Sequence, residues 1–139
     1  MKKILILCTG NSCRSQIAHG ILASNTKGVA KIYSAGIETH GVNPKAIATL
    51  NEIGIEISNH SSNLVDEYFS IDFDFIITVC DHAAENCPVF PSKTAKRLHH
   101  NFTDPSKIVG TEKEIKAAFR KTIEEIEAYC KTFIKDQLG

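Results

Sequence analysis

The chain has 139 residues, which suits a single domain that buries a core without disulfide bonds. Its formal net charge is zero, so overall charge favours neither nucleic acid nor an anionic membrane as a partner. The apolar run after Lys2 and Lys3 is too short for a secretion signal, and no segment approaches the ~20 apolar residues of a membrane span. We therefore expect one domain over residues 1–139, in the cytoplasm, with any anion site formed locally.

The first half of the chain predicts alternating strands and helices. Lys3–Cys8 is a short, continuous apolar run, typical of a strand that is buried on both faces of a parallel sheet. Turn residues follow at 9–12, and Arg14–Asn25 is predicted to form a helix with one apolar face. A second strand is expected at Val29–Ser34, broken by Gly36.

The middle of the chain continues the alternation. Pro44 opens a predicted helix through about Ile53, and Gly54 supplies its stop. Phe73–Cys80 is the clearest strand because its residues are apolar and β-prone, and 95–102 is a further short strand. The predicted helix has four apolar positions for burial: Ala46, Ile47, Leu50 and Ile53.

A long helix is predicted from Glu112 to about Lys135. Its apolar positions step by three or four residues: Ile115, Phe119, Ile123, Ile126, Cys130, Phe133 and Ile134. Cys130 lies on this stripe, so we interpret it as core packing. The alternation predicts an α/β fold of three layers, α/β/α, around a four-stranded parallel sheet. Ligands bind at the carboxyl ends of such strands, where Cys8 and Cys80 should emerge together.

The segment Cys8–Ser15 has the spacing Cys-x5-Arg between a predicted strand and a helix. Gly10 allows a tight curl and Asn11 tolerates a left-handed conformation. A loop that enters a helix N-terminus directs N–H groups inward, which suits a tetrahedral oxyanion. The expected binding residues are Thr9, Gly10, Asn11, Ser12, Cys13, Arg14 and Ser15.

Two side chains give this loop its chemistry. Arg14 offers a planar fork that binds two oxygen atoms at once, and the local field favours the thiolate form of Cys8, which is the nucleophile. Ser15 is placed to donate a hydrogen bond to that thiolate. The alternative is a buried, inert Cys8 with Arg14 in a surface ion pair. No dinucleotide or nucleoside triphosphate motif is present.

Cys80 and Cys87 lie seven positions apart. On a continuous helix their Cα atoms would be about 10 Å apart at ~1.5 Å per residue. A disulfide needs roughly 4.4–6.8 Å, so pairing would require this turn to unwind, and we expect a mobile segment there. The alternatives are a core residue for Cys80, an incidental loop thiol for Cys87, or a zinc site in which both join His82 and either His99 or His100.

The motifs together resemble a known family. Cys8–Ser15 is similar to the phosphate loop of low-molecular-weight protein tyrosine phosphatases, and still more to the thioredoxin-coupled arsenate reductases that share their fold. The resemblance covers nearly the whole chain. It rests on residues 8–16, on Tyr-Ser-Ala-Gly-Ile at 33–37, on Cys80, on Cys87-Pro88 and on Asp104-Pro105.

The resemblance implies a low-molecular-weight phosphatase-like fold and a reduction without a cofactor or metal. Cys8 would attack arsenate, Cys80 would attack Cys8 and release arsenite, and Cys87 would then attack Cys80. Thioredoxin would reduce the final disulfide by exchange. Arsenate would be the substrate, with phosphate or sulfate as competing oxyanions. By the same resemblance Asp104 is the general acid that protonates the departing oxygen; the alternative is an Asp that only starts a turn.

The sequence departs from both groups at several positions. Several related reductases bind potassium through an Asn, a Ser and two carboxylates. Asn11 and Ser34 match, whereas His19 and Asn63 stand at the carboxylate positions, so we expect weak or no potassium binding. The phosphatases usually have Pro where Gln16 stands, and an aromatic residue where Ser106 stands.

Three hypotheses remain at this stage. The first is an arsenate reductase, the second a tyrosine phosphatase, and the third a non-catalytic thiol sensor or metal-binding module. A phosphatase needs neither Cys80 nor Cys87, so those residues discriminate the first two. Nothing in the sequence demands a second subunit, and we expect a monomer.

Overall fold

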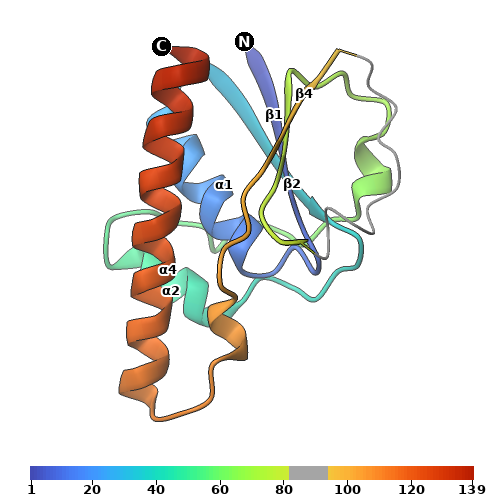
Figure 1. The fold of residues 1–139 in the computed structure, drawn as a ribbon. Coiled ribbons are helices and arrows are strands. Elements are labelled where there is room, and N and C mark those ends of the chain that lie inside the picture. Colours follow the sequence, from blue (N-terminus) through green and yellow to red (C-terminus); the bar gives the residue numbers. More distant parts are fainter. Residues whose placement is uncertain (82–93) are drawn as a thin grey trace.

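The computed structural model describes residues 1–81 and 94–139, and a parallel sheet lies at its centre (Figure 1). The sheet order is β2-β1-β3-β4, with every pair parallel. The strands are β1 at Lys2–Cys8, β2 at Ala30–Gly36, β3 at Phe75–Thr78 and β4 at Lys96–His99. The predicted four-stranded parallel sheet is therefore confirmed.

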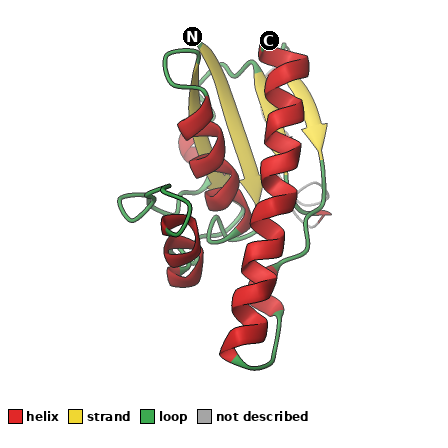
Figure 2. Ribbon diagram, turned by 90° about the vertical axis from the view of Figure 1, so that its left-hand side faces the viewer, coloured by secondary structure: helices red, strands yellow, loops and turns green. Residues whose placement is uncertain are grey.

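Helices cover both faces of the sheet. α1 (Arg14–Asn25) and α4 (Glu112–Phe133) pack together against one face, with α2 (Pro44–Asn51) below α1 and beside the lower half of α4 (Figure 2). The short 3₁₀ helix Val65–Tyr68 lies on the opposite side (Figure 1). These are the three layers of the predicted α/β/α fold. Within the described residues, no helix is long and apolar enough to cross a membrane.

The apolar run of β1 serves two cores because successive side chains point to opposite faces of a strand. Ile4, Ile6 and Cys8 join the larger core beneath α1 and α4. Leu5 and Leu7 join a smaller core on the other face, in which the partners include Val65, Phe73 and Ile76. Burial on both faces explains why this strand is a continuous apolar run rather than an alternating one.

The long C-terminal helix is built as its periodicity predicts. Thr111 caps it by accepting a hydrogen bond from the Glu114 N–H at 3.2 Å. The buried positions follow one face: Phe119, Ile123, Ile126, Cys130 and Phe133. Cys130 is 2% exposed, which confirms its place in the core. The α-helix ends at Phe133, two residues before the predicted end, and continues as a π-helical turn over Ile134–Leu138.

Two sequence predictions about boundaries were wrong. Gly36 does not break the second strand but is its last residue, paired with Cys8, because the strand runs on along the full length of β1. Ile53 does not belong to a buried stripe, since α2 ends at Asn51 and the side chain is 48% exposed in the turn that follows.

The last two strands are also shorter than predicted. β3 spans Phe75–Thr78 rather than 73–80, although the N–H groups of Asp74 and Val79 extend its pairing to β1 by one residue at each end. β4 spans Lys96–His99 rather than 95–102 because this edge strand pairs only with β3 and ends level with it.

We predict that Gly36→Ala destabilises the protein and disorders the loop after β1. A Cβ at this position would lie 2.6 Å from the carbonyl oxygens of Thr9 and Glu38, and 2.7 Å from the Asn11 nitrogen. All three are backbone atoms with little room to move, so we expect a loss of about 2 kcal/mol or more in urea unfolding. Gly110→Ala is the control, because its Cβ would meet only the flexible side chain of Glu114. Equal stability of the two variants would contradict this packing argument.

Candidate active site

The loop after β1 is held from outside by its carbonyl groups. Carbonyl oxygens of four consecutive residues, 9–12, accept hydrogen bonds from donors beyond the loop. The donors are the backbone N–H groups of Glu38, His40 and Asn43, at 3.0 Å each, and the side chains of Gln16 and Ser62, at 3.1 and 2.9 Å. In a trans peptide the N–H points away from the preceding carbonyl. This arrangement therefore turns N–H groups toward the inside of the loop, which is how a backbone binds an anion.

Asn11 fixes the shape of the loop. It has a φ of 47°, the left-handed conformation that its sequence position suggested, and its side chain is fully buried. Its Oδ1 accepts from the Asn63 backbone N–H at 2.8 Å, and its Nδ2 donates to Ser15 Oγ at 2.8 Å. A backbone N–H only donates, so this bond determines which way the Asn11 amide faces.

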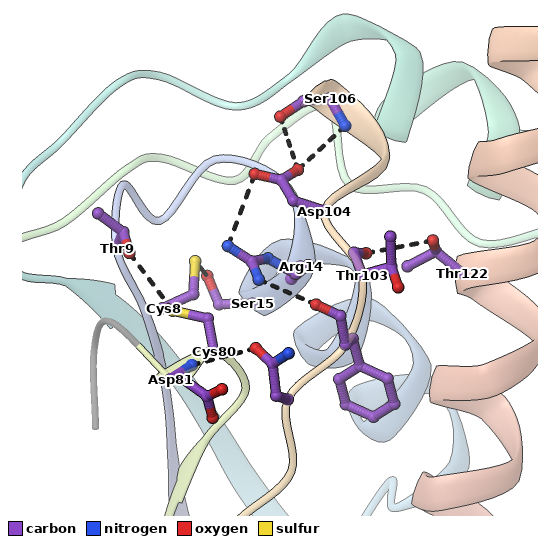
Figure 3. A network of polar contacts seen from close by, with 12 residues as sticks. Cys8, Thr9, Arg14, Ser15, Cys80, Asp81, Thr103, Asp104, Ser106 and Thr122 are labelled. Atoms are coloured by element: carbon purple, nitrogen blue, oxygen red, sulfur yellow. Dashed lines mark hydrogen bonds and ion pairs between the residues drawn. The ribbon is translucent and has the colours of Figure 1, made fainter. Parts of the chain in front are cut away.

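Ser15 lies 3.0 Å from the Cys8 sulfur (Figure 3). The Ser15 oxygen already accepts from Asn11, so its own hydrogen is available to the sulfur. A hydrogen bond donated to sulfur favours the thiolate over the thiol. Asn11 and Ser15 thus direct a hydrogen-bond donor at the sulfur of Cys8, which is itself 4% exposed.

A cavity of about 440 Å³ opens over this loop, and six of the predicted loop residues line it: Cys8, Thr9, Gly10, Ser12, Cys13 and Arg14. Asn11 and Ser15 are fully buried and lie outside this lining, so their side chains support the loop rather than form the cavity wall. Burial, followed by the charges of Asp104 and Cys8, raises the pKa of Cys13 far above its ordinary value. Cys13 therefore remains a neutral thiol, consistent with a structural role.

Asp104 pairs with Arg14 at the wall of the cavity (Figure 3). Its Oδ2 lies 3.5 Å from Arg14 Nη2, while Arg14 Nη1 donates to the Phe102 carbonyl at 2.9 Å. The other carboxylate oxygen of Asp104 accepts from the Ser106 N–H at 3.0 Å and from its hydroxyl at 2.6 Å. Asp104 does start a turn, because it caps the 3₁₀ helix Pro105–Lys107, yet it also lines the cavity beside the candidate nucleophile.

Cys80 reaches the same edge of the sheet as Cys8. Leu7 pairs with Thr78 in the β1–β3 register, so Cys8, the last residue of β1, and Cys80, two residues after β3, lie at the ends of neighbouring strands. The Cys80 sulfur lies 3.3 Å from the hydroxyl of Thr9, the residue next to Cys8 (Figure 3). Cys80 is 1% exposed. Cys87, His82 and the segment predicted to unwind lie outside the described residues.

The sequence reasoning missed part of the cavity wall. Glu38, His40 and Lys107 also line it, and His40 Nε2 lies 3.0 Å from Glu38 Oε2. A Cβ on Gly10 would lie 2.6 Å from His40 Nδ1, so the imidazole covers the loop at that point. The signal available in the sequence was Glu38 and His40, just after the 33–37 motif, but their placement depends on how residues 38–40 bond to the loop.

Behind the loop, a pair of histidines occupies the region of the proposed cation ligands. His19 Nδ1 lies 2.8 Å from Ser34 Oγ, and the His19 and His60 ring centroids are 4.3 Å apart. Burial, and next the His60 charge, lower the pKa of His19 to about 4, so the ring is neutral at pH 7. His60 Nδ1 lies 3.0 Å from Gln16 Oε1, which connects the pair to the loop. Weak potassium binding stays a prediction.

The two remaining histidines of the described residues have separate contacts. His99 lies between Thr78 and Asp81, whereas the His100 ring packs on Phe102 and Tyr129. Among the described residues there is no group of three or more His, Cys, Asp or Glu side chains suited to a metal ion. Because His82 and Cys87 lie outside these residues, the zinc alternative is not tested.

We predict that Ser15→Ala slows alkylation of Cys8 by iodoacetamide at pH 7. A hydrogen bond to a charged group contributes about 1.5–3 kcal/mol, so the rate should fall by about tenfold or more. The rate is measured by mass spectrometry of the Cys8 peptide. Ser24→Ala, which removes a hydroxyl elsewhere on α1, serves as the matched control. An unchanged rate in Ser15→Ala would show that the hydroxyl does not support the thiolate.

His19 predicts a loss of stability at acidic pH. The unfolded chain binds a proton on this ring at its ordinary pKa of 6.5, whereas the folded chain binds it at about 4. The stability from this group is therefore complete above pH 6.5 and is lost as the pH falls toward 4. Urea unfolding should give a free energy about 2 kcal/mol lower at pH 5 than at pH 7 from His19 alone. His19→Gln should reduce that difference; an unaltered pH dependence would contradict the assignment.

The comparisons with known proteins agree with this geometry. The model of the family "Low molecular weight phosphotyrosine protein phosphatase" matches residues 3–138. Two curated relatives are both named "Arsenate reductase". The protein from Halalkalibacterium halodurans is 46% identical and that from Bacillus subtilis 44% identical, each over 132 residues, 95% of this chain and 94% of the relative.

Solved structures share the fold. One, described as an arsenate reductase in the phosphate-binding state, has a TM-score of 0.75 at 28% identity and covers 95% of this chain and 98% of its own. A low-molecular-weight protein tyrosine phosphatase from T. tengcongensis has a TM-score of 0.80 at 23% identity, covering 97% of this chain and 99% of its own. The chain belongs to the low molecular weight phosphotyrosine protein phosphatase family.

Proposed function

We propose that this protein is a cytoplasmic enzyme that reduces arsenate to arsenite in arsenic detoxification, acting as a monomer. Two relatives that are 44–46% identical over nearly their whole length are named arsenate reductase, and a similar structure was determined in a phosphate-binding state. The observation that carries the proposal is the position of Cys80, whose sulfur lies beside Thr9 at the same loop as Cys8. Phosphate ester hydrolysis does not require a second thiol at this position.

The first step uses the loop and Asp104. The loop N–H groups and Arg14 bind the arsenate oxygens, and the Cys8 thiolate attacks arsenic. The S–As bond forms as an As–O bond breaks, and a proton from Asp104 lets that oxygen leave as water. The position of Asp104 at the cavity wall near Arg14 supports this role.

The second step transfers two electrons. The Cys80 sulfur attacks the Cys8 sulfur, an S–S bond forms, and the S–As bond breaks with its electron pair passing to arsenic. As(V) becomes As(III), and the Cys80 thiol proton goes to an arsenite oxygen. Cys87 then attacks Cys80, which frees Cys8 and leaves a Cys80–Cys87 disulfide. Thioredoxin, a dithiol reductant, would reduce that disulfide by thiol–disulfide exchange and restore both thiols.

A tyrosine phosphatase is the second candidate. The family and the Cys8–Arg14–Asp104 arrangement favour it, because the loop chemistry is common to both activities. The described part of the cavity wall weighs against it, because it contains no Phe, Tyr or Trp side chain to pack on a tyrosyl ring.

The test is arsenate-dependent NADPH oxidation coupled through thioredoxin and thioredoxin reductase. Wild type should turn over continuously, Cys87→Ser should release about one equivalent of arsenite and stop, and Cys8→Ser should release none. Cys130→Ala is the control, because this thiol lies on the buried face of α4 and turnover should not depend on it. No turnover in wild type, together with brisk hydrolysis of p-nitrophenyl phosphate, would instead assign the protein to the phosphatases.

A further inference from the structure

The His99 ring bridges the chain on both sides of Cys80. Its Nδ1 lies 2.7 Å from the Thr78 hydroxyl, two residues before the cysteine. Its Nε2 lies 2.7 Å from the Asp81 carboxylate, one residue after the cysteine. A carboxylate only accepts, so Nε2 carries the hydrogen and the ring orientation is determined. One side chain from β4 therefore fixes the backbone segment in which Cys80 lies.

We call the contacts of His99 with Thr78 and Asp81 the bracket. The residues after β4 add further hydrogen bonds to it. The Asp81 N–H donates to Asn101 Oδ1 at 3.1 Å, a contact drawn beside Cys80 in Figure 3. The Phe102 N–H donates to the Val79 carbonyl at 3.2 Å. Positions 78, 79 and 81 are thus all bonded to the stretch 99–102. Cys80 lies at the centre of this set.

The bracket contributes little to global stability because its side chains lie at the exposed edge of the sheet. The His99 and Asp81 side chains are 39% and 64% exposed, and ion pairs in such positions contribute little to the free energy of unfolding. Cys80, in contrast, is almost fully buried, with its sulfur beside the Thr9 hydroxyl. The contacts therefore act on the local position of one thiol more than on the fold.

We propose that Asp81, His99 and Asn101 are positioning residues for Cys80, holding its sulfur at Thr9 for attack on Cys8. This inference rests on the proposed relay and concerns only its second step. In that step the Cys80–Cys8 bond forms, the S–As bond breaks, arsenic takes the electron pair, and the thiol proton passes to arsenite. Small displacements of reacting atoms slow such a step severely, whereas the loop that binds the oxyanion is untouched.

The Cys87→Ser background isolates this step, because arsenite release there ends at the Cys8–Cys80 disulfide. Reduced protein is mixed with excess arsenate, and the single-turnover rate of arsenite release is followed by rapid quench. Asp81→Asn and His99→Gln should each lower that rate by about tenfold. Asp81→Glu, which keeps the carboxylate, should restore part of it. Asp72→Asn is the matched control at an exposed aspartate.

A purely structural role gives a different pattern. If the bracket only stabilises the edge of the sheet, the variants should lower the melting temperature. They should then also weaken phosphate binding by the loop. We expect instead an unchanged Kd for inorganic phosphate by calorimetry and an unchanged alkylation rate of Cys8. Thr78→Val removes the hydroxyl that contacts His99 without changing charge. It gives a second test if the Asp81→Asn or the His99→Gln protein fails to fold.

Two outcomes would overturn the inference. Folded Asp81→Asn and His99→Gln proteins that release arsenite at the parent rate would show that Cys80 needs no bracket. A parallel loss of phosphate affinity would show that these residues act on the loop instead. If the Cys87→Ser parent itself releases no arsenite, the proposed function fails, and this inference fails with it.

Discussion

The hydrogen bond from the Asn63 backbone to the Asn11 side chain determines how the rest of the site is built. It holds a buried amide at a residue with φ of 47°, a conformation that few side chains adopt without support. The same amide donates to Ser15, and Ser15 in turn contacts Cys8. Without this bond the Asn11 amide would have no fixed orientation. The hydrogen of the Ser15 hydroxyl would then not be directed toward the Cys8 sulfur.

The sheet supplies the second constraint. Parallel strands end at one edge, so β1 and β3 deliver Cys8 and Cys80 to the same place, and the segment after β4 brings Asp104 there. Gly36 at the end of β2 lets the loop approach closely, because any side chain there would meet backbone atoms. The chemistry is thus assembled from strand ends that lie far apart in the sequence.

The sequence predicted the parts that depend on local pattern. The bounds of α1, the left-handed Asn11 and the buried Cys130 all followed from spacing and residue type. The missed features depend on tertiary contacts. The role of Gly36 is visible only once β2 lies against the loop, and Ile53 is exposed because α2 ends early. The sequence indicated His99 only as a possible zinc ligand, yet β3–β4 pairing brings it to Thr78 and Asp81, on either side of Cys80.

We propose that oxidation by arsenate passes from Cys8 through Cys80 to Cys87. The most direct measurement is disulfide mapping by mass spectrometry, after reduced protein has reacted with one equivalent of arsenate and been alkylated. We expect a Cys80–Cys87 disulfide, an alkylated Cys8 and one equivalent of arsenite. Full alkylation of all three cysteines, with arsenate recovered unchanged, would contradict it.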